Sequence, residues 1–174
     1  MFKEDVSKFS LTLLWLIANI CAENNLFIHQ SVLKSSLYPF ILLNTRSANK
    51  AIKKEATWAL VNLTTGSDIE LVSAIVQMDG MSCLINVLWY EEDPILLNLA
   101  LEGVKCILKH GDDFSELNNQ MNPFKFQFEK ENGNLCLEKL LKHPHKNVYE
   151  ESKELMNKYY GDICMQEDDY FRDS

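Results

Sequence analysis

A tryptophan–asparagine pair recurs along this chain at a fixed spacing. Trp15 and Asn19 lie in LLWLIANICAE, whereas Trp58 and Asn62 lie in ATWALVNLTTG, so each residue of the second pair follows its counterpart by 43 positions. Self-similarity with a period of roughly 40–47 residues is typical of armadillo-like repeats, in which small groups of helices stack on their neighbours. This spacing predicts a helical repeat array rather than a globule with one central core.

Two further units follow these pairs. A third unit ends in LALEGVKCILKHGDD, where Cys106 follows Asn62 by 44 positions and Gly111 follows Gly66 by 45. A fourth and more divergent unit closes with VYEESKELMNKYYG, which ends at Gly161. A chain of 174 residues has room for about three and a half such units.

The hydrophobic pattern within the units is helical. No segment shows sustained alternation of apolar and polar residues, so we expect no sheet. The fold expected for residues 1–161 is therefore an all-α, right-handed armadillo-repeat superhelix, followed by an acidic, disordered tail at residues 162–174. The apolar groups that repeat at three-to-four spacing, one for each of three helices, are Ile69, Val72, Ile75 and Val76, then Met81, Leu84, Ile85 and Leu88, then Ile95, Leu96, Leu99 and Val104.

Glycine and proline mark the expected helix ends. Asp93 and Pro94 read as a cap followed by a first-turn proline, which predicts a helix start. The polar segment from residue 111 to residue 122 predicts a mobile connection. Four glycines are expected at helix ends, where a left-handed residue is useful: Gly66, Gly80, Gly111 and Gly161.

Composition narrows the function. The net charge of −8 and pI near 5.0 oppose attraction to nucleic acids or anionic membranes and favour a basic partner. Only six glycines are present, which disfavours a phosphate-cradling loop, and no cofactor is expected. The cysteines are odd in number and lack a CxxC pair, which predicts buried thiols rather than disulfides or a zinc site: Cys21, Cys83, Cys106, Cys136 and Cys164.

The apolar stretch near the N-terminus raises two alternatives. Residues 9–22 form a run of fourteen residues, shorter than the roughly 18 that a membrane span needs, so no transmembrane helix is expected. A secretory signal is the other alternative, because Lys3 precedes the run. Glu4 and Asp5 spoil its positive start, and Ile20 spoils a small-residue cleavage site.

The two Trp-Asn pairs are the candidate binding site. Residues four apart leave the same helix face, and stacked repeats would place the pairs roughly 10 Å apart as a ladder. Neighbouring indoles can sandwich a lysine stem, and asparagine amides can donate to and accept from a peptide backbone. Glu55, three residues before Trp58, could pair with a lysine or arginine of the ligand. The alternative is that both tryptophans are core residues and both asparagines are ordinary surface amides.

Other patterns carry less weight. His143 and His145 flank a proline without a nearby carboxylate or thiol pattern, so we expect loop residues and no metal. Asn62 also begins a glycosylation sequon, which we discount inside a helix. No catalytic arrangement of side chains has local support, so we expect no enzymatic activity. A basic stretch predicts a solvated helix face more than a nucleic-acid patch or a signal: Arg46, Lys50, Lys53 and Lys54.

Several segments resemble a known family. KKEATWALVNLTTGSDIELVSAIVQMDGMSCLINVL, at residues 53–88, and LALEGVKCILKHGDD, at residues 99–113, resemble the C-terminal armadillo repeats of importin-α, the adaptors that carry nuclear localisation signals. Residues 122–162 resemble that family's last repeat, and an acidic tail follows in its usual place. The resemblance extends from about Leu11 to Phe171 and is most specific over residues 54–66.

The resemblance implies a binding site for lysine-rich signals. Both Trp-Asn pairs fall where the family forms its minor signal-binding site, and Glu55 falls on that site's acidic position. Thr12 stands where the preceding repeat of the family has a glutamate, and the third unit presents Glu102 and Cys106, as expected beyond the groove. The implied peptide-binding residues are Trp15, Asn19, Glu55, Trp58 and Asn62.

Partners and location are also implied by the resemblance. Cargo proteins with basic signals, the recycling export receptor and nucleoporins are the expected partners, in cytoplasm and nucleus, with no nucleic acid and no membrane. Importin-β is doubtful, because no segment matches the basic stretch that binds it. The alternative function is a truncated scaffold or competitor that keeps only the C-terminal surface. The residues expected to meet the export receptor are Glu150, Glu151, Glu154, Asp168 and Asp169.

The first helix is also expected to lack a partner on one side. A chain that starts inside a repeat leaves an apolar helix face uncovered unless residues 1–10 fold back as a cap, because solenoid units contact only their neighbours. We therefore expect self-association there. The apolar residues around this helix are Leu11, Leu14, Leu16, Ile17 and Ile20.

Overall fold

The computed structural model describes residues 2–161. The expected acidic tail, with Asp168 and Asp169, lies outside the described residues. The part described contains ten α-helices and no strand, which confirms the all-α class. The helices are α1 (Phe2–Ala22), α2 (Leu26–Lys34), α3 (Leu37–Asn44), α4 (Lys50–Thr65), α5 (Ile69–Gln77), α6 (Gly80–Tyr90), α7 (Pro94–Asn118), α8 (Pro123–Lys130), α9 (Gly133–Leu140) and α10 (Lys146–Tyr160).

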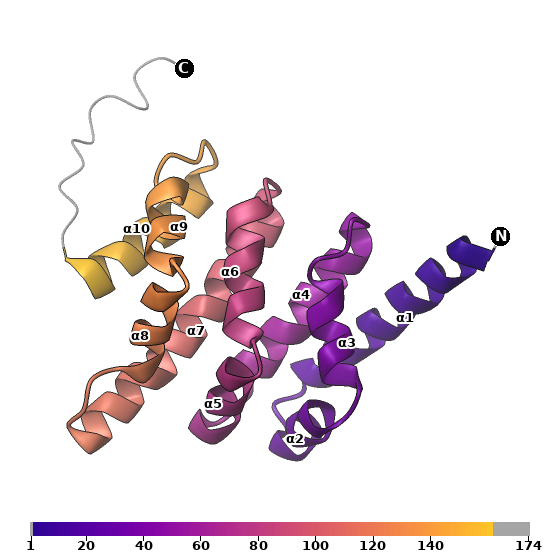
Figure 1. Ribbon diagram of the computed structural model, residues 1–174, viewed down its shortest axis with the longest axis horizontal. Coiled ribbons are helices and arrows are strands. Elements are labelled where there is room, and N and C mark those ends of the chain that lie inside the picture. Colours follow the sequence, from indigo (N-terminus) through magenta and orange to yellow (C-terminus); the bar gives the residue numbers. More distant parts are fainter. Residues whose placement is uncertain (1, 162–174) are drawn as a thin grey trace.

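The helices form a solenoid of three-helix units. Two short helices precede one longer helix in each unit, so the units are α2–α4, α5–α7 and α8–α10, and α1 is the third helix of a unit before them. Figure 1 shows the units stacked along the long axis, with α1, α4, α7 and α10 in succession. These third helices pack in sequence, α1 on α4, α4 on α7 and α7 on α10, and each of α4, α7 and α10 also packs on the second helix of its own unit.

Short polar residues start most of these helices. The side chain of Asn49 accepts hydrogen bonds from backbone N–H groups at the start of α4, and Asn25 and Asn122 do the same for α2 and α8. Asp93 caps α7 and Pro94 occupies its first turn, as expected. These caps satisfy N–H groups that would otherwise lack a partner at a helix start.

The prediction of a mobile segment at residues 111–122 is wrong, because α7 continues through Gly111 to Asn118. Asp112 stabilises the last turns of α7, which follow Gly111. Its carboxylate accepts from the Asn122 amide at 2.7 Å and from the Tyr159 hydroxyl at 2.7 Å, and it pairs with Lys158 at 2.8 Å. Burial alone would raise the pKa of Asp112, but these hydrogen bonds outweigh it and lower the pKa.

The prediction that four glycines lie at the C-terminal ends of helices is wrong for two of them. Gly111 lies inside α7, and Gly80 begins α6, where Asp79 takes the left-handed conformation with φ 66°. Gly66 does end α4, although its φ of −97° is not left-handed. Gly161 ends α10 with φ 91°, as expected.

The cysteines in the described residues are free thiols. Cys21, Cys83 and Cys136 are buried and Cys106 is half-buried, which agrees with the expectation of buried thiols. Burial raises the pKa of Cys21 and of Cys136 to about 12, so both are neutral at physiological pH.

One helix is long and apolar enough to cross a membrane by length and composition, contrary to the expectation from the fourteen-residue run. This segment of α1 runs from Glu4 to Ala22 and so begins five residues before the apolar run at residues 9–22. Its mean hydropathy is 1.3 over the most apolar window. Two bent pairs, α2 with α3 and α5 with α6, also pass by length and composition. In this structure the buried face of α1 joins the solenoid core through Leu14, Ile17, Ala18 and Cys21.

Candidate functional site

Two exposed tryptophans lie on adjacent third helices. Trp15 is on α1 and Trp58 is on α4, and 55% and 37% of their surfaces are exposed. A tryptophan that served only the core would be largely covered. The fully buried positions of these two helices are held instead by apolar residues such as Leu14 and Leu60. These exposures argue against the alternative that both tryptophans are core residues.

The asparagines of the pairs are held by backbone carbonyls. The amide nitrogen of Asn62 donates to the Ala18 carbonyl of α1 at 2.8 Å, and that of Asn19 donates to the Trp15 carbonyl at 2.7 Å. Within the described residues neither carboxamide oxygen has a hydrogen-bond partner, so each can accept from a ligand N–H. One N–H of each amide is therefore hydrogen-bonded within the protein. The expectation was that the whole amide, donor and acceptor, would bind the ligand.

Glu55 lies on α4 near the indole of its own unit, three residues before Trp58. Its side chain is half-buried, and it takes part in none of the ion pairs found among the described residues. Thr12 of α1, the counterpart of Glu55, is exposed, and its hydroxyl donates to the Lys8 carbonyl at 3.0 Å. The candidate site therefore has one carboxylate, from Glu55, because Thr12 occupies the equivalent position on α1.

The next third helix changes the chemistry of this surface. Cys106 of α7 replaces the asparagine, and its thiol donates to the Thr64 carbonyl at 3.3 Å, much as Asn62 donates to Ala18. Glu102 replaces the tryptophan and is exposed. The Trp-Asn ladder in the described residues is therefore confined to α1 and α4.

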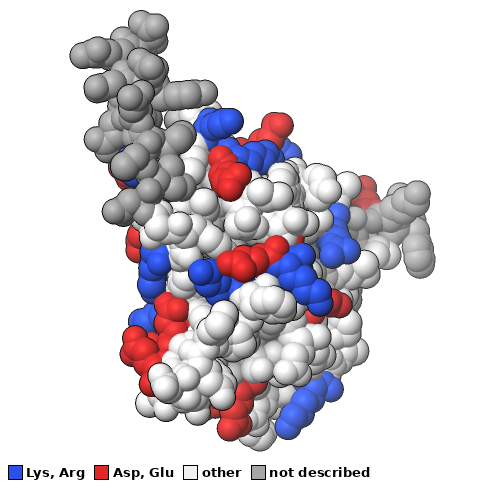
Figure 2. Space-filling model, turned by 60° about the vertical axis from the view of Figure 1, so that its left-hand side comes forward, with Lys and Arg blue, Asp and Glu red and all other residues white. Residues whose placement is uncertain are grey.

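A hollow of about 680 Å³ lies between α7 and α10 and is lined by acidic residues and Lys105. Lys105 pairs with Glu151 at 3.3 Å and with Glu154 at 2.8 Å. All three acids are therefore partly neutralised within the protein, because Glu150, which is exposed, forms an ion pair with Lys146 at 3.6 Å. On the face shown in Figure 2, acidic and basic side chains lie beside one another rather than in one acidic surface.

The basic stretch does not form one solvated helix face. Arg46 precedes α4, and Lys53 pairs with Glu91 at 2.9 Å, where the Glu91 side chain is only 7% exposed. Burial alone would raise the pKa of Glu91, but hydrogen bonds from Lys53 and from the backbone N–H groups of residues 92 and 93 lower it. This pair joins the start of α4 to the end of α6.

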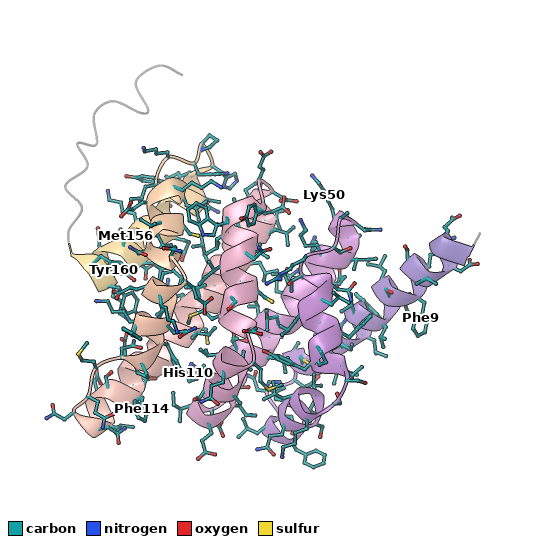
Figure 3. The ribbon with its side chains drawn as sticks, in the orientation of Figure 1. Phe9, Lys50, His110, Phe114, Met156 and Tyr160 are labelled. Carbon is teal, nitrogen blue, oxygen red and sulfur yellow. The ribbon has the colours of Figure 1, made fainter. Side chains whose placement is uncertain are left out.

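Two histidines that the sequence analysis did not single out join neighbouring units. His29 is buried, with its ring nitrogens 2.9 Å from the Cys21 carbonyl and 3.1 Å from the Ser67 hydroxyl. His110 of α7, labelled in Figure 3, lies 3.0 Å from the Ser67 carbonyl.

The two histidines that the sequence analysis did consider lie in the turn before α10. His143 accepts from the His145 backbone N–H at 3.1 Å, as loop residues do. Among the described residues, no group of three or more metal-binding side chains gathers.

The chain is similar to two curated plant proteins. It is 31% identical to importin subunit alpha-4 of Arabidopsis thaliana over 69% of this chain, and 28% identical to importin subunit alpha-5 of the same plant over 83% of this chain. The chain spans 30% and 27% of the length of these relatives. No protein-family model matches the sequence.

Solved structures show the same fold at lower sequence identity. An engineered protein is 19% identical, with a TM-score of 0.65 over 82% of this chain and 53% of that chain. A designed armadillo repeat protein in complex with the peptide (KR)4 is 17% identical, with a TM-score of 0.51 over 84% of this chain and 73% of that chain.

Stacked three-helix units and these structural neighbours define the class, an armadillo-repeat α-solenoid. Within that class the two curated relatives identify the chain as an importin-α-like armadillo-repeat protein.

Proposed function

We propose that this chain works in a nuclear import adaptor and binds lysine-rich nuclear localisation signals across α1 and α4. The observation that carries the proposal is the exposure of Trp15 and Trp58 on adjacent helices, each with an asparagine one turn away whose oxygen has no partner among the described residues. Large exposed aromatic side chains in a row are typical of a binding surface.

The ladder suits an extended basic peptide. A lysine stem packs between the two indoles, and the ammonium group lies against their faces, where cation–π attraction contributes on the order of 0.5–2 kcal/mol. The Asn19 and Asn62 oxygens accept from the peptide backbone, which fixes its direction without reading its side chains. Glu55 then pairs with one basic side chain beyond the indoles.

The net charge of −8 supports the same class of ligand, because it attracts basic peptides over distances longer than a contact. Both curated relatives are importin α subunits by name. One structural neighbour is a designed protein in complex with (KR)4, which makes a peptide of lysine and arginine a natural probe. A protein with this role would shuttle between cytoplasm and nucleus.

The test is a calorimetric titration at low salt with a lysine-rich peptide and with a peptide of the same length in which glutamine replaces each lysine. Saturable binding of the first peptide alone, with micromolar affinity, is expected because the ladder has two indoles and one acid. Equal binding of both peptides, or binding of neither, would show that the ladder does not select lysine.

The second candidate is a scaffold that uses the C-terminal surface to bind the recycling export receptor or nucleoporins. Glu150 is exposed at the edge of the hollow between α7 and α10, where it forms an ion pair with the exposed Lys146 that a basic partner could replace. Glu151 and Glu154 are already paired with Lys105, so a partner would have to compete with that lysine. Charge reversal at Glu150, followed by a pull-down with the export receptor at two salt concentrations, tests this function.

A further inference from the structure

The row of side chains that forms the ladder continues from α4 onto α7. Glu102 of α7 stands 44 positions after Trp58. The same offset takes buried core residues of α4 to buried core residues of α7, Leu60 to Val104 and Leu63 to Ile107. Because the buried faces of the two helices match in this register, Glu102 occupies on α7 the position that the Trp58 indole has on α4.

The row extends once more, onto α10. Glu150 follows Glu102 by 48 positions. That offset also takes buried residues of α7 to buried residues of α10: Ala100 to Val148, Val104 to Ser152, Ile107 to Leu155 and Leu108 to Met156. The third helices, which stand in succession in Figure 1, therefore carry two indoles followed by two carboxylates. We call this row the extended ladder: Trp15, Trp58, Glu102 and Glu150.

Both carboxylates of the extended ladder are accessible to a ligand. Glu102 is exposed, and its carboxylate takes part in none of the ion pairs or side-chain hydrogen bonds found within residues 2–161. Glu150 is exposed too, and its 3.6 Å pair with Lys146 joins two exposed side chains of one helix. Such pairs contribute little to stability, so a basic side chain of a ligand can replace Lys146 at low cost.

The hollow of about 680 Å³ between α7 and α10 adjoins these two acids and is suited to a cation. The ammonium group of Lys105 already lies there, 3.3 Å from Glu151 and 2.8 Å from Glu154. The wall of the hollow also contains Asn98, whose carboxamide oxygen is buried and has no hydrogen-bond partner among the described residues. A buried acceptor without a donor is costly, so an ammonium group or a peptide N–H that reaches Asn98 would stabilise it.

We propose that a peptide bound at the indoles continues along the extended ladder, and that Glu102 selects a second basic side chain of the same peptide. This inference rests on the proposed function, because the indoles anchor the peptide. Continuity of the row with the ladder favours the same ligand for both parts, and the two carboxylates favour a basic side chain. Glu150 lies one helix further along and receives the next basic side chain.

The spacing of the third helices sets the distance between the two basic residues. Neighbouring helices pack roughly 10 Å apart, so Glu102 lies about 15 Å along the row from a lysine seated midway between the indoles. An extended peptide advances about 3.3 Å per residue. The second basic residue is therefore expected about four or five residues from the seated lysine, and on one side only, because the row continues in one direction.

Calorimetric titration of the whole chain at low salt with a set of designed peptides tests this spacing. The reference peptide carries one pair of adjacent lysines among uncharged polar residues. Each derivative adds a third lysine, either five residues or two residues from the pair, on the N-terminal or the C-terminal side. One of the two peptides with a spacing of five should bind about three- to fivefold more tightly than its isomer with a spacing of two, as expected for an exposed ion pair. Equal binding of the isomers on both sides would overturn the proposal.

Substitution of the acid tests whether Glu102 is responsible. Glu102→Gln should abolish the preference for the spacing of five and change the affinity for the reference peptide less than about twofold. Glu138→Gln is the matched control, because it removes the same charge from an exposed residue of α9, which does not line the hollow. A preference that persists in Glu102→Gln, or that is lost equally in Glu138→Gln, would overturn the proposal.

Salt and the reference peptide separate this inference from the function on which it rests. The preference should fall below about twofold at high salt, because exposed charges are then screened. Binding of the reference peptide without any preference for spacing overturns the role of Glu102 alone. Binding of none of the peptides overturns lysine recognition by the ladder and, with it, this inference.

Discussion

Removal of the Trp58 indole should weaken binding of a lysine-rich peptide to the ladder. Trp58 is 37% exposed, and so presents one part of its ring to a ligand and packs the rest against the protein. Loss of cation–π attraction and of packing on the lysine stem should together cost about 2 kcal/mol, which is about a thirtyfold rise in the dissociation constant. Isothermal titration calorimetry of Trp58→Ala with the lysine-rich peptide measures this rise.

The same substitution also affects folding. The buried part of the indole contributes about 3 kcal/mol to the free energy of unfolding, at roughly 25 cal/mol per Å² of buried surface. Affinity must therefore be measured well below the melting temperature of the variant. Trp89→Phe is the matched control, because Trp89 lies on α6, where its carbonyl accepts from Lys139 at 2.6 Å. A Trp58→Ala protein that is folded and binds as tightly as the wild type would refute the reasoning.

Four further outcomes follow from single contacts. Asn62→Ala should weaken peptide binding by about 1 kcal/mol, measured by the same titration, because it removes one acceptor for the peptide backbone. The same change removes the hydrogen bond from α4 to the Ala18 carbonyl of α1. Thr12→Glu should strengthen binding severalfold at low salt and much less at high salt, since it supplies the missing carboxylate. Hydrogen bonds lower the pKa of Glu91 in the folded chain, so the ionised carboxylate stabilises the fold at neutral pH, and this stabilisation is lost as the pH falls through the lowered pKa. In urea unfolding, the free energy of unfolding of Glu91→Gln should therefore fall less with acid than that of the wild type. Asp112→Ala should destabilise the chain by about 2 kcal/mol and increase hydrogen exchange over residues 111–118, and unchanged exchange there would contradict the role given to its network.

The repeat and the ladder could be predicted from the sequence because both depend on local spacing. A 43-residue offset with the same residues one turn apart identifies equivalent helices without knowledge of their packing. Exposure of Trp15 and Trp58 then follows, since the core positions of these helices are already filled by residues such as Leu14 and Leu60.

The features that were missed depend on residues distant in sequence. Gly111 and the polar residues after it predict a helix end locally, but Tyr159 and Lys158, more than forty positions away, hold Asp112 within a longer α7. The bond from Asn62 to Ala18 likewise requires the two helices to be in place. The start of α1 was missed for a different reason, because charged residues interrupt the apolar run while remaining compatible with a helix.

The most direct test of lysine binding at the ladder is a two-dimensional NMR titration that follows the indole N–H signals. The chain has three tryptophans and therefore three such signals, which single substitutions assign. On addition of the lysine-rich peptide, the signals of Trp15 and Trp58 should shift together along one saturation curve, while that of Trp89 stays in place. Saturable peptide binding that leaves the Trp15 and Trp58 signals unmoved would contradict the account.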